Sequence, residues 1–163
     1  TEAYLNAMKN PCVNIIGHPD DGRYEVDYEA LVQGAREYGK VLELNNHSMD
    51  PDCNRENAVE NDTIMLEYCK KYRVPVVMDS DAHFDLLIGE FDLARDLLTK
   101  LDFPEELVLN RSVEMIIEDG EMCMATGSHK IYFGGLVRPY IRLARNFSEM
   151  FGISVVKTKK KKK

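Results

Sequence analysis

No stretch of the sequence approaches the roughly 18 consecutive apolar residues that a membrane-spanning helix needs. The first residues, from Thr1 onward, contain neither the basic segment nor the apolar core of a signal peptide. The sequence also begins without an initiator methionine, from which we expect that residues precede Thr1 in the natural protein. These absences argue against a membrane-spanning or exported protein and favour a cytoplasmic one.

Closely spaced cysteines are absent as well. The four cysteines form no C-x-x-C pair, and none lies beside a histidine at zinc-finger spacing: Cys12, Cys53, Cys69 and Cys123. We expect buried or incidental thiols in a reducing compartment. The glycine-rich loops that cradle nucleotides and the G-x-S-x-G turn of serine hydrolases are also missing, which leaves those activities without support.

The composition is that of a globular domain. The chain has 163 residues, of which 44% are hydrophobic and 30% are charged. This length is enough to bury a real core, and the composition excludes a disordered chain, a collagen-like repeat and a small disulfide scaffold.

The net charge of -7 is unevenly distributed. Residues 1–120 hold 11 Lys and Arg against 26 Asp and Glu, a balance of -15, whereas residues 121–163 hold 10 against 2, a balance of +8. An acidic body repels phosphate chains at long range, so we expect no nucleic-acid surface on it. Only the basic end of the chain has the charge to attract a nucleic acid or a membrane surface.

Strands and helices are predicted to alternate. Three apolar runs predict buried parallel strands, at residues 12–16, 41–44 and 74–78. Helical patterns follow them in turn, at about residues 27–38, 54–71 and 90–100. This order predicts an α/β fold with parallel strands and right-handed crossovers.

The regular pattern ends near Gly120. Before it we expect the end of a helix at residues 2–9, a fourth short strand at residues 107–109 and a short helix at residues 113–117. Beyond it, residues 137–151 have the pattern of a basic amphipathic helix, and the chain ends in five lysines. We therefore predict two parts, an α/β unit at residues 1–118 and a basic, partly disordered tail at residues 119–163.

Polar residues follow each predicted strand. His18 follows the first, and Asp81 and His83 follow the third. Since the carboxyl ends of parallel strands form one face, these side chains should converge, and imidazole and carboxylate are ligands of divalent metals. The alternative for each histidine is a loop residue or a hydrogen-bonded core histidine.

Three further residues are candidates for supporting roles. Asn45 and Asn46 follow the middle strand and have the chemistry to orient metal ligands, although asparagine side chains also stabilise turns. Arg55 is a candidate for binding a phosphate group with both arms of its guanidinium, with an exposed residue near a helix start as the alternative.

Several segments together resemble the PHP (polymerase and histidinol phosphatase) family. They match in order over about residues 5–117: residues 15–19 (IIGHP), 23–27 (RYEVD), 42–46 (LELNN) and 79–83 (DSDAH). Residues 89–91 (GEF), 101–104 (LDFP) and 108–110 (VLN) are similar to the small YcdX-like phosphatase branch.

The resemblance implies a fold and an activity. The fold is a distorted, TIM-like (βα)7 barrel, of which this chain would form roughly the C-terminal half. The activity is hydrolysis of phosphomonoesters by metal-activated water, with up to three divalent ions, zinc first and manganese or iron as alternatives. His18, Asp81 and His83 would be metal ligands, and Asp81 would also accept a proton from the attacking water.

The family's opening His-x-His motif, its further histidines and its bridging Glu have no counterpart in this sequence. One alternative is therefore a non-catalytic PHP-type fragment or accessory binding module that lacks most metal ligands. For partners we expect a small phosphorylated substrate, no nucleic acid on the body, no membrane, and self-association of the chain. The substrate, the metal and the role of residues 119–163 stay open at this point.

Overall fold

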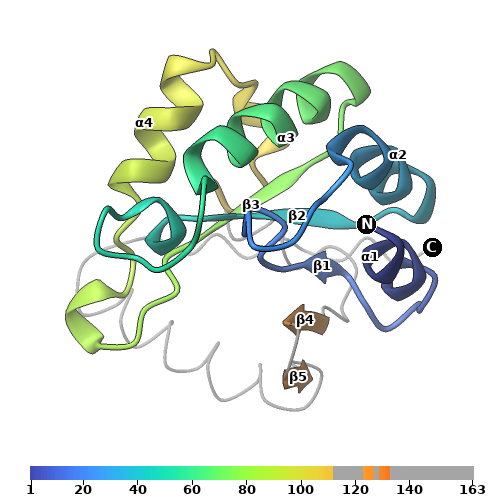
Figure 1. Ribbon diagram of the computed structural model, residues 1–163, viewed down its shortest axis with the longest axis horizontal. Helices are drawn as coiled ribbons and strands as arrows, with labels where there is room; N and C mark the ends of the chain where they lie inside the picture. The colour runs from blue at the N-terminus through green and yellow to red at the C-terminus, as the bar shows by residue number, and fades with distance from the viewer. Residues whose placement is uncertain (112–122, 127–128, 133–163) are drawn as a thin grey trace, which may run out of the picture.

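The computed structural model describes residues 1–111, 123–126 and 129–132 (Figure 1). The helices are α1 (Glu2–Met8), α2 (Tyr28–Tyr38), α3 (Ala58–Tyr72) and α4 (Asp92–Lys100). The strands are β1 (Ile15–Ile16), β2 (Val41–Asn45), β3 (Val76–Asp79), β4 (Cys123–Thr126) and β5 (His129–Tyr132). Short 3₁₀ turns are η1 (His47–Met49), η2 (Asp85–Leu87), η3 (Glu105–Leu107) and η4 (Leu109–Arg111).

The strands form one sheet in the order β3-β2-β1-β4-β5. Strands β1, β2 and β3 are parallel, with Ile16 opposite Leu42 and Leu42 opposite Val76. The predicted α/β class with parallel strands is confirmed. Because the three strands run in the same direction, their carboxyl ends lie along one edge of the sheet, where the predicted site residues follow.

Strands β4 and β5 come from the segment that the sequence assigns to the basic tail. β4 pairs with β1 in parallel, and β5 pairs with β4 in antiparallel orientation. These two short strands therefore extend the sheet, while the predicted helices at residues 113–117 and 137–151 lie outside the described residues. Within the described part, β3 and β5 are the two edges of an open sheet, so the partial barrel stays a prediction.

Helix α2 shows how the sequence sets the element boundaries. The Asp27 side chain accepts a hydrogen bond from the Ala30 backbone N–H at 3.0 Å, which caps the first turn. Gly39 ends the helix with a φ of 63°, a left-handed conformation that costs glycine little. Both boundaries agree with the prediction from the sequence.

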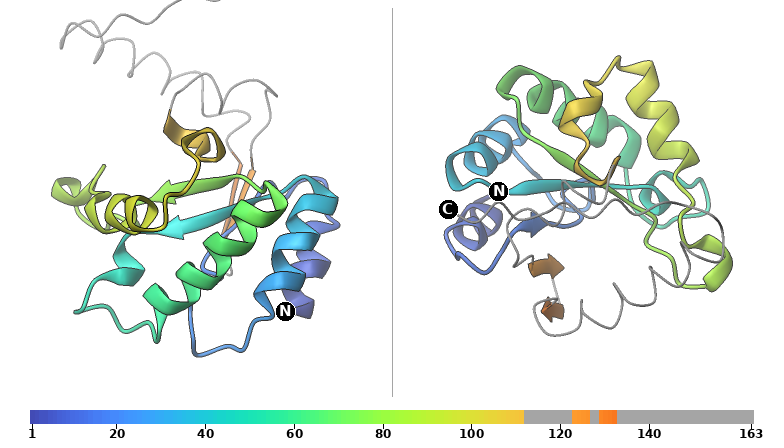
Figure 2. Two further views of the ribbon diagram at one scale, coloured as in Figure 1. Left: turned by 90° about the horizontal axis from the view of Figure 1, so that it is seen from above. Right: turned by 180° about the vertical axis from the view of Figure 1, so that it is seen from behind.

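Helices α2, α3 and α4 lie on one side of strands β2 and β3 (Figures 1 and 2). Their apolar faces bury a core against the sheet, and its most enclosed members share zero exposure: Leu31, Val32, Leu42, Leu44, Met65, Leu66, Val74 and Val76. Among the described residues, no helix is long and apolar enough to cross a membrane.

The predicted fourth strand at residues 107–109 is wrong. This segment forms the turns η3 and η4, and a single parallel bridge joins Val108 to Val76 of β3. The Asn110 side chain replaces a further strand residue, since its Oδ1 accepts from the Met78 N–H at 3.0 Å and its Nδ2 donates to the Met78 carbonyl at 2.8 Å. The Asn110 amide thus forms hydrogen bonds with both backbone groups of Met78, at an edge of the sheet where such groups would otherwise be unpaired.

Candidate functional site

The first site residue, His18, follows β1, and its backbone is hydrogen-bonded to the side chain of Glu43 in β2. The His18 backbone N–H donates to Glu43 Oε2 at 2.6 Å, and His18 Nδ1 lies 3.3 Å from the same oxygen. His18 has a φ of 53°, a left-handed conformation that costs a non-glycine residue energy. The hydrogen bond to the 3% exposed Glu43 side chain holds this backbone in place.

The Arg55 guanidinium contacts both ring nitrogens of His18 and links this side chain to the loop after β3. Its Nη1 is 2.7 Å from His18 Nδ1, and its Nη2 is 3.3 Å from His18 Nε2 and 3.3 Å from Asp81 Oδ2. Nη1 also donates to the Ser48 hydroxyl. Arg55 lies in the loop before α3, because that helix begins at Ala58 and not near residue 54 as predicted. The loop leaves the guanidinium free to reach across the edge of the sheet.

Asp81 and His83 belong to the loop after β3. Asp81 has a φ of 47°, and its backbone N–H donates to the Asp79 Oδ1 at 2.6 Å. His83 Nδ1 lies 2.8 Å from the Asp81 carbonyl oxygen. A carbonyl only accepts, so Nδ1 carries the proton and the Nε2 lone pair of neutral His83 is free.

The two asparagines have different surroundings. Asn45 Nδ2 lies 3.2 Å from His18 Nδ1, and its Oδ1 accepts from the Ser48 N–H at 2.9 Å. The Asn46 side chain instead accepts from the Ala94 N–H at 2.9 Å and thereby caps the first turn of α4. Asn45 therefore contacts a predicted metal ligand, whereas Asn46 fixes a helix.

Burial favours the neutral forms of His18 and Glu43 beside the positively charged Arg55. Burial lowers the pKa of His18, and the charge of Arg55 lowers it further. Burial raises the pKa of Glu43 to about 8, against the hydrogen bond from the His18 backbone, which lowers it. At neutral pH the His18 and Glu43 side chains thus meet as an uncharged pair, and a neutral imidazole is the form that binds metals.

The side chains of the centre are of types that bind divalent metals, but there are too few of them in the described residues to hold an ion. In the part of the chain that the structure describes, no group of three or more His, Cys, Asp or Glu side chains is placed to hold an ion. His18 and Asp81 offer a nitrogen and an oxygen on one edge of the sheet, and Arg55 lies between them. These residues therefore provide a partial ligand set, beside a cation suited to a phosphate group.

Two buried carboxylates lie beside this centre. Asp20 and Asp62 are 1% and 0% exposed, and none of their carboxylate oxygens has a hydrogen-bond partner among the described residues. Burial raises the pKa of Asp62 well above its ordinary value, the charges of Asp20 and Glu43 raise it further, and Arg55 lowers it. A buried carboxylate without a partner opposes folding when it is ionised.

We predict that Asp62→Asn stabilises the protein more at pH 8 than at pH 4. A carboxyl whose pKa is higher in the folded state contributes most below its unfolded pKa, and that stability is lost as the pH rises toward the folded pKa. The asparagine does not titrate, so the variant should gain about 1–3 kcal/mol over the parent at pH 8 and little at pH 4. Urea denaturation at both values measures this. The exposed Asp96→Asn should change neither value, and equal effects of Asp62→Asn at the two pH values would contradict the prediction.

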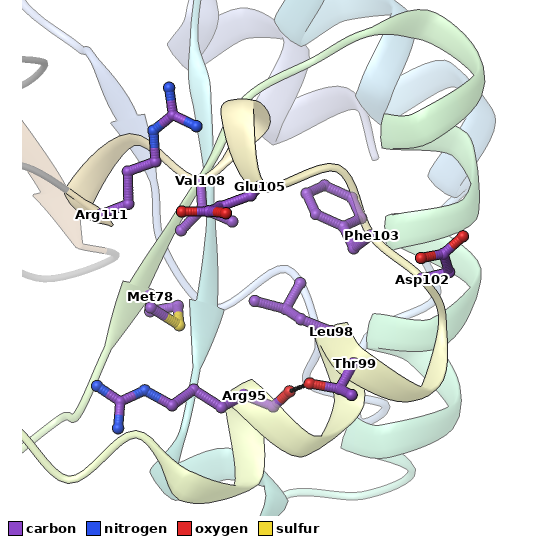
Figure 3. Close-up of a pocket in the computed structure, with 9 residues that line it drawn as sticks. All are labelled: Met78, Arg95, Leu98, Thr99, Asp102, Phe103, Glu105, Val108 and Arg111. Atoms are coloured by element: carbon purple, nitrogen blue, oxygen red, sulfur yellow. Dashed lines mark hydrogen bonds between the residues drawn. The ribbon is translucent and has the colours of Figure 1, made fainter.

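A separate pocket lies between α4, the turns after it and β3 (Figure 3). Its volume is about 400 Å³. Apolar side chains line it together with polar and charged ones: Met78, Leu98, Phe103 and Val108, with Arg95, Thr99, Asp102, Glu105 and Arg111. None of the predicted site residues lines it, so this pocket and the His18 centre are in different places.

Sequence reasoning missed two residues of the centre. Glu43 contacts His18 and Ser48 contacts Arg55, and neither is among the predicted site residues. The signal for Glu43 was available, because a glutamate in the middle of an apolar strand between Leu42 and Leu44 is unusual for a buried position. Ser48 carries no such signal, since serine is common in turns.

The chain is similar to proteins named "Probable phosphatase" from several bacteria. It is 43% identical over 118 residues to one from Caldicellulosiruptor saccharolyticus, 42% over 117 residues to one from Caldicellulosiruptor bescii, and 42% over 118 residues to one from Acetivibrio thermocellus. Each match covers 72% of this chain and 48% of the relative. No family model matches the chain.

The chain therefore spans about half the length of the curated relatives that it matches. By sequence, this chain is a relative of bacterial proteins named probable phosphatases over 72% of its length.

Proposed function

We propose that residues 1–118 are part of a metal-dependent phosphatase of the PHP type, in its YcdX-like branch, that hydrolyses small phosphomonoesters. The observation that carries the proposal is the cluster of His18, Arg55 and Asp81 at the carboxyl ends of parallel strands. The similarity to proteins named probable phosphatases supports it. In this proposal the region is about half of a TIM-like barrel, and residues 119–163 are a basic tail from which β4 and β5 add two short strands to the sheet.

His18, Asp81 and His83 would hold the divalent ions, with zinc first and manganese or iron as alternatives. When bound, such ions neutralise phosphate oxygens and lower the pKa of a water molecule. The remaining ligands would come from polypeptide outside the described residues. Asn45 orients the His18 ring through its contact with Nδ1, and Glu43 fixes the His18 backbone.

Arg55 and Asp81 would act on the substrate. The guanidinium carries donors in a fixed fork that matches two oxygens of a phosphate group. To bind a phosphate, the Arg55 guanidinium would turn away from His18 and stay close to Asp81. At present Arg55 Nη2 lies 3.3 Å from Asp81 Oδ2. The Asp81 carboxylate would accept the proton that the attacking water loses, since it is a basic oxygen beside Arg55 with 24% of its side chain exposed to solvent.

A chimeric protein tests this function. The 118 matched residues of the Caldicellulosiruptor saccharolyticus relative would be replaced by those of this chain. We expect the chimera to hydrolyse p-nitrophenyl phosphate with added Zn²⁺ or Mn²⁺ and to lose activity with a chelator, while the isolated chain shows little turnover. A folded but inactive chimera would contradict the proposal, and so would chelator-resistant activity. Strong activity of the isolated chain would contradict the partial ligand set.

A second candidate is a non-catalytic PHP-type module that binds a partner. Two observations favour it: no group of three metal-binding side chains occurs in the described part, and Arg55 covers both ring nitrogens of His18. Phe84, Leu86 and Ile88 are 72%, 85% and 74% exposed in the loop after His83, which also supports self-association. An inactive chimera would favour this module over the enzyme.

The proposal includes a cytoplasmic location, with small phosphorylated substrates as partners and neither nucleic acid nor membrane bound by the body. Free thiols at Cys12, Cys53 and Cys69 are consistent with a reducing compartment.

A further inference from the structure

Two histidines from different loops meet at the edge of the sheet. The rings of His47, in the turn after β2, and His83, in the loop after β3, have centroids 6.1 Å apart and are tilted by 55°. The tilt excludes face-to-face stacking. Metal–nitrogen bonds of about 2.0–2.1 Å at the tetrahedral angle place the centroids of two rings on one ion roughly 5.2 Å apart, so a shift of about 1 Å between the rings brings the pair onto a shared ion.

The contact of His83 with the Asp81 carbonyl assigns the proton of the neutral ring to Nδ1. The Nδ1–H donates to the Asp81 carbonyl at 2.8 Å, which leaves the Nε2 lone pair available. Metal-binding histidines typically donate their other ring N–H to such a partner, because this fixes the tautomer and the ring orientation. His83 is exposed and His47 is partly exposed, so an ion can reach both from solvent.

The backbones of the two histidines are fixed to a common residue, Asp79 at the end of β3. The N–H of Asn46, directly before His47, donates to the Asp79 carbonyl at 2.7 Å. The N–H of Asp81, two residues before His83, donates to the Asp79 Oδ1 at 2.6 Å. His47 is held further by its own carbonyl, which accepts from the Asp50 N–H at 3.1 Å. These bonds fix the distance between the two loop backbones, and a pair of ligands on loops that are already joined costs less to order on binding.

We propose that His47 and His83 together bind one divalent transition-metal ion, with water completing its coordination. The pair deepens the proposed function, because it adds His47 to the side chains that hold metal, and it rests on that function only for the use of the ion in catalysis. Imidazole suits zinc, nickel and copper, and the site contains no thiolate, so the bound ion has nitrogen and oxygen ligands.

Zinc titration of the full 163-residue chain by calorimetry tests the pair. We expect one saturable site, weakened about tenfold or more by His47→Gln and by His83→Gln. The double variant should lose less affinity than the product of the two single losses, since either change alone already removes the chelate. His129→Gln, which changes a histidine outside the pair in β5, should leave the affinity unchanged. Circular dichroism of each variant checks that the fold is retained.

The outcomes separate this inference from the proposed function. Loss of zinc binding in His83→Gln but not in His47→Gln would overturn the pair and leave the proposed role of His83 intact. Zinc binding that depends on both residues, together with an inactive chimera, would support the pair and count against the phosphatase. Cobalt(II) gives a second readout: a sulfur-to-metal charge-transfer band would overturn the assignment, because His47 and His83 contribute only nitrogen.

Discussion

Asp81→Asn in the active chimera should lower kcat for p-nitrophenyl phosphate by about 10²–10⁴-fold, the range expected when a positioned acid–base group is lost. Asparagine has nearly the same shape, but it neither accepts a proton at neutral pH nor carries the negative charge that a metal ligand supplies. The contact with Arg55 at 3.3 Å would survive only as a weaker, uncharged interaction. Steady-state kinetics with saturating metal measures the effect.

The matched control is Asp85→Asn, an exposed aspartate in the same loop whose side chain accepts a hydrogen bond from the Leu86 N–H. We expect this variant to retain the parental kcat. If Asp81→Asn kept more than a tenth of the activity, the carboxylate would be neither a required ligand nor the proton acceptor, and the assignment of Asp81 would be wrong.

Arg55→Met should lower kcat/KM by about 10–100-fold, because charge-assisted hydrogen bonds to a phosphate are worth about 1.5–3 kcal/mol. We expect most of the loss in KM and in the inhibition constant of inorganic phosphate. Arg55→Lys should recover only part of the affinity, since an ammonium group lacks the fork that binds two oxygens at once. Arg23→Met provides a control, because Arg23 pairs with Asp21 outside the site.

The opposite result for Arg55 would also be informative. In the structure the guanidinium covers both ring nitrogens of His18 and thus stands between His18 and any incoming ion. Higher activity or tighter zinc binding in Arg55→Met would mean that Arg55 opposes metal binding at His18, and its assignment to the substrate would be wrong.

The buried acids beside this centre lower the stability of the folded protein when they are ionised. Glu43, Asp20 and Asp62 are nearly inaccessible, and Arg55 is the cation whose charge lowers the pKa of Asp62. Removing Arg55 therefore has a second expected effect, a loss of stability, so the kinetics of Arg55→Met are to be measured on protein whose folded state has been checked by circular dichroism.

Much of the architecture follows from local sequence. The apolar runs before His18, after Lys40 and before Asp79 give three parallel strands, because such runs are buried on both faces in α/β sheets. Asp27 and Gly39 set the ends of α2 through short-range hydrogen bonding and backbone freedom. The placement of His18, Asp81 and His83 after strand ends follows from the same pattern. Periodicity and capping act over a few residues, which is why a single sequence reveals them.

Other features depend on contacts between distant segments. Residues 107–109 look like a strand, but Asn110 binds the Met78 backbone with its side chain and the chain turns instead. The pairing of β4 with β1 joins residues more than 100 positions apart, and no local pattern predicts such a pairing. No local pattern predicts the contacts of His18 with Glu43 and Arg55 either, because these residues come from β2 and from the loop before α3.

The amino-acid sequence alone specifies the chemical groups at the edge of the sheet: imidazoles, carboxylates and a guanidinium in the segments after buried strands. Which of these groups meet depends on the folded chain. The tertiary structure placed Arg55 between His18 and Asp81, turned Asn46 toward α4 rather than the site, and set His47 beside His83. The physical reason is that side-chain type is fixed residue by residue, whereas distance and direction are set by the register of the strands and by backbone hydrogen bonds, such as those to Asp79, that join separate loops.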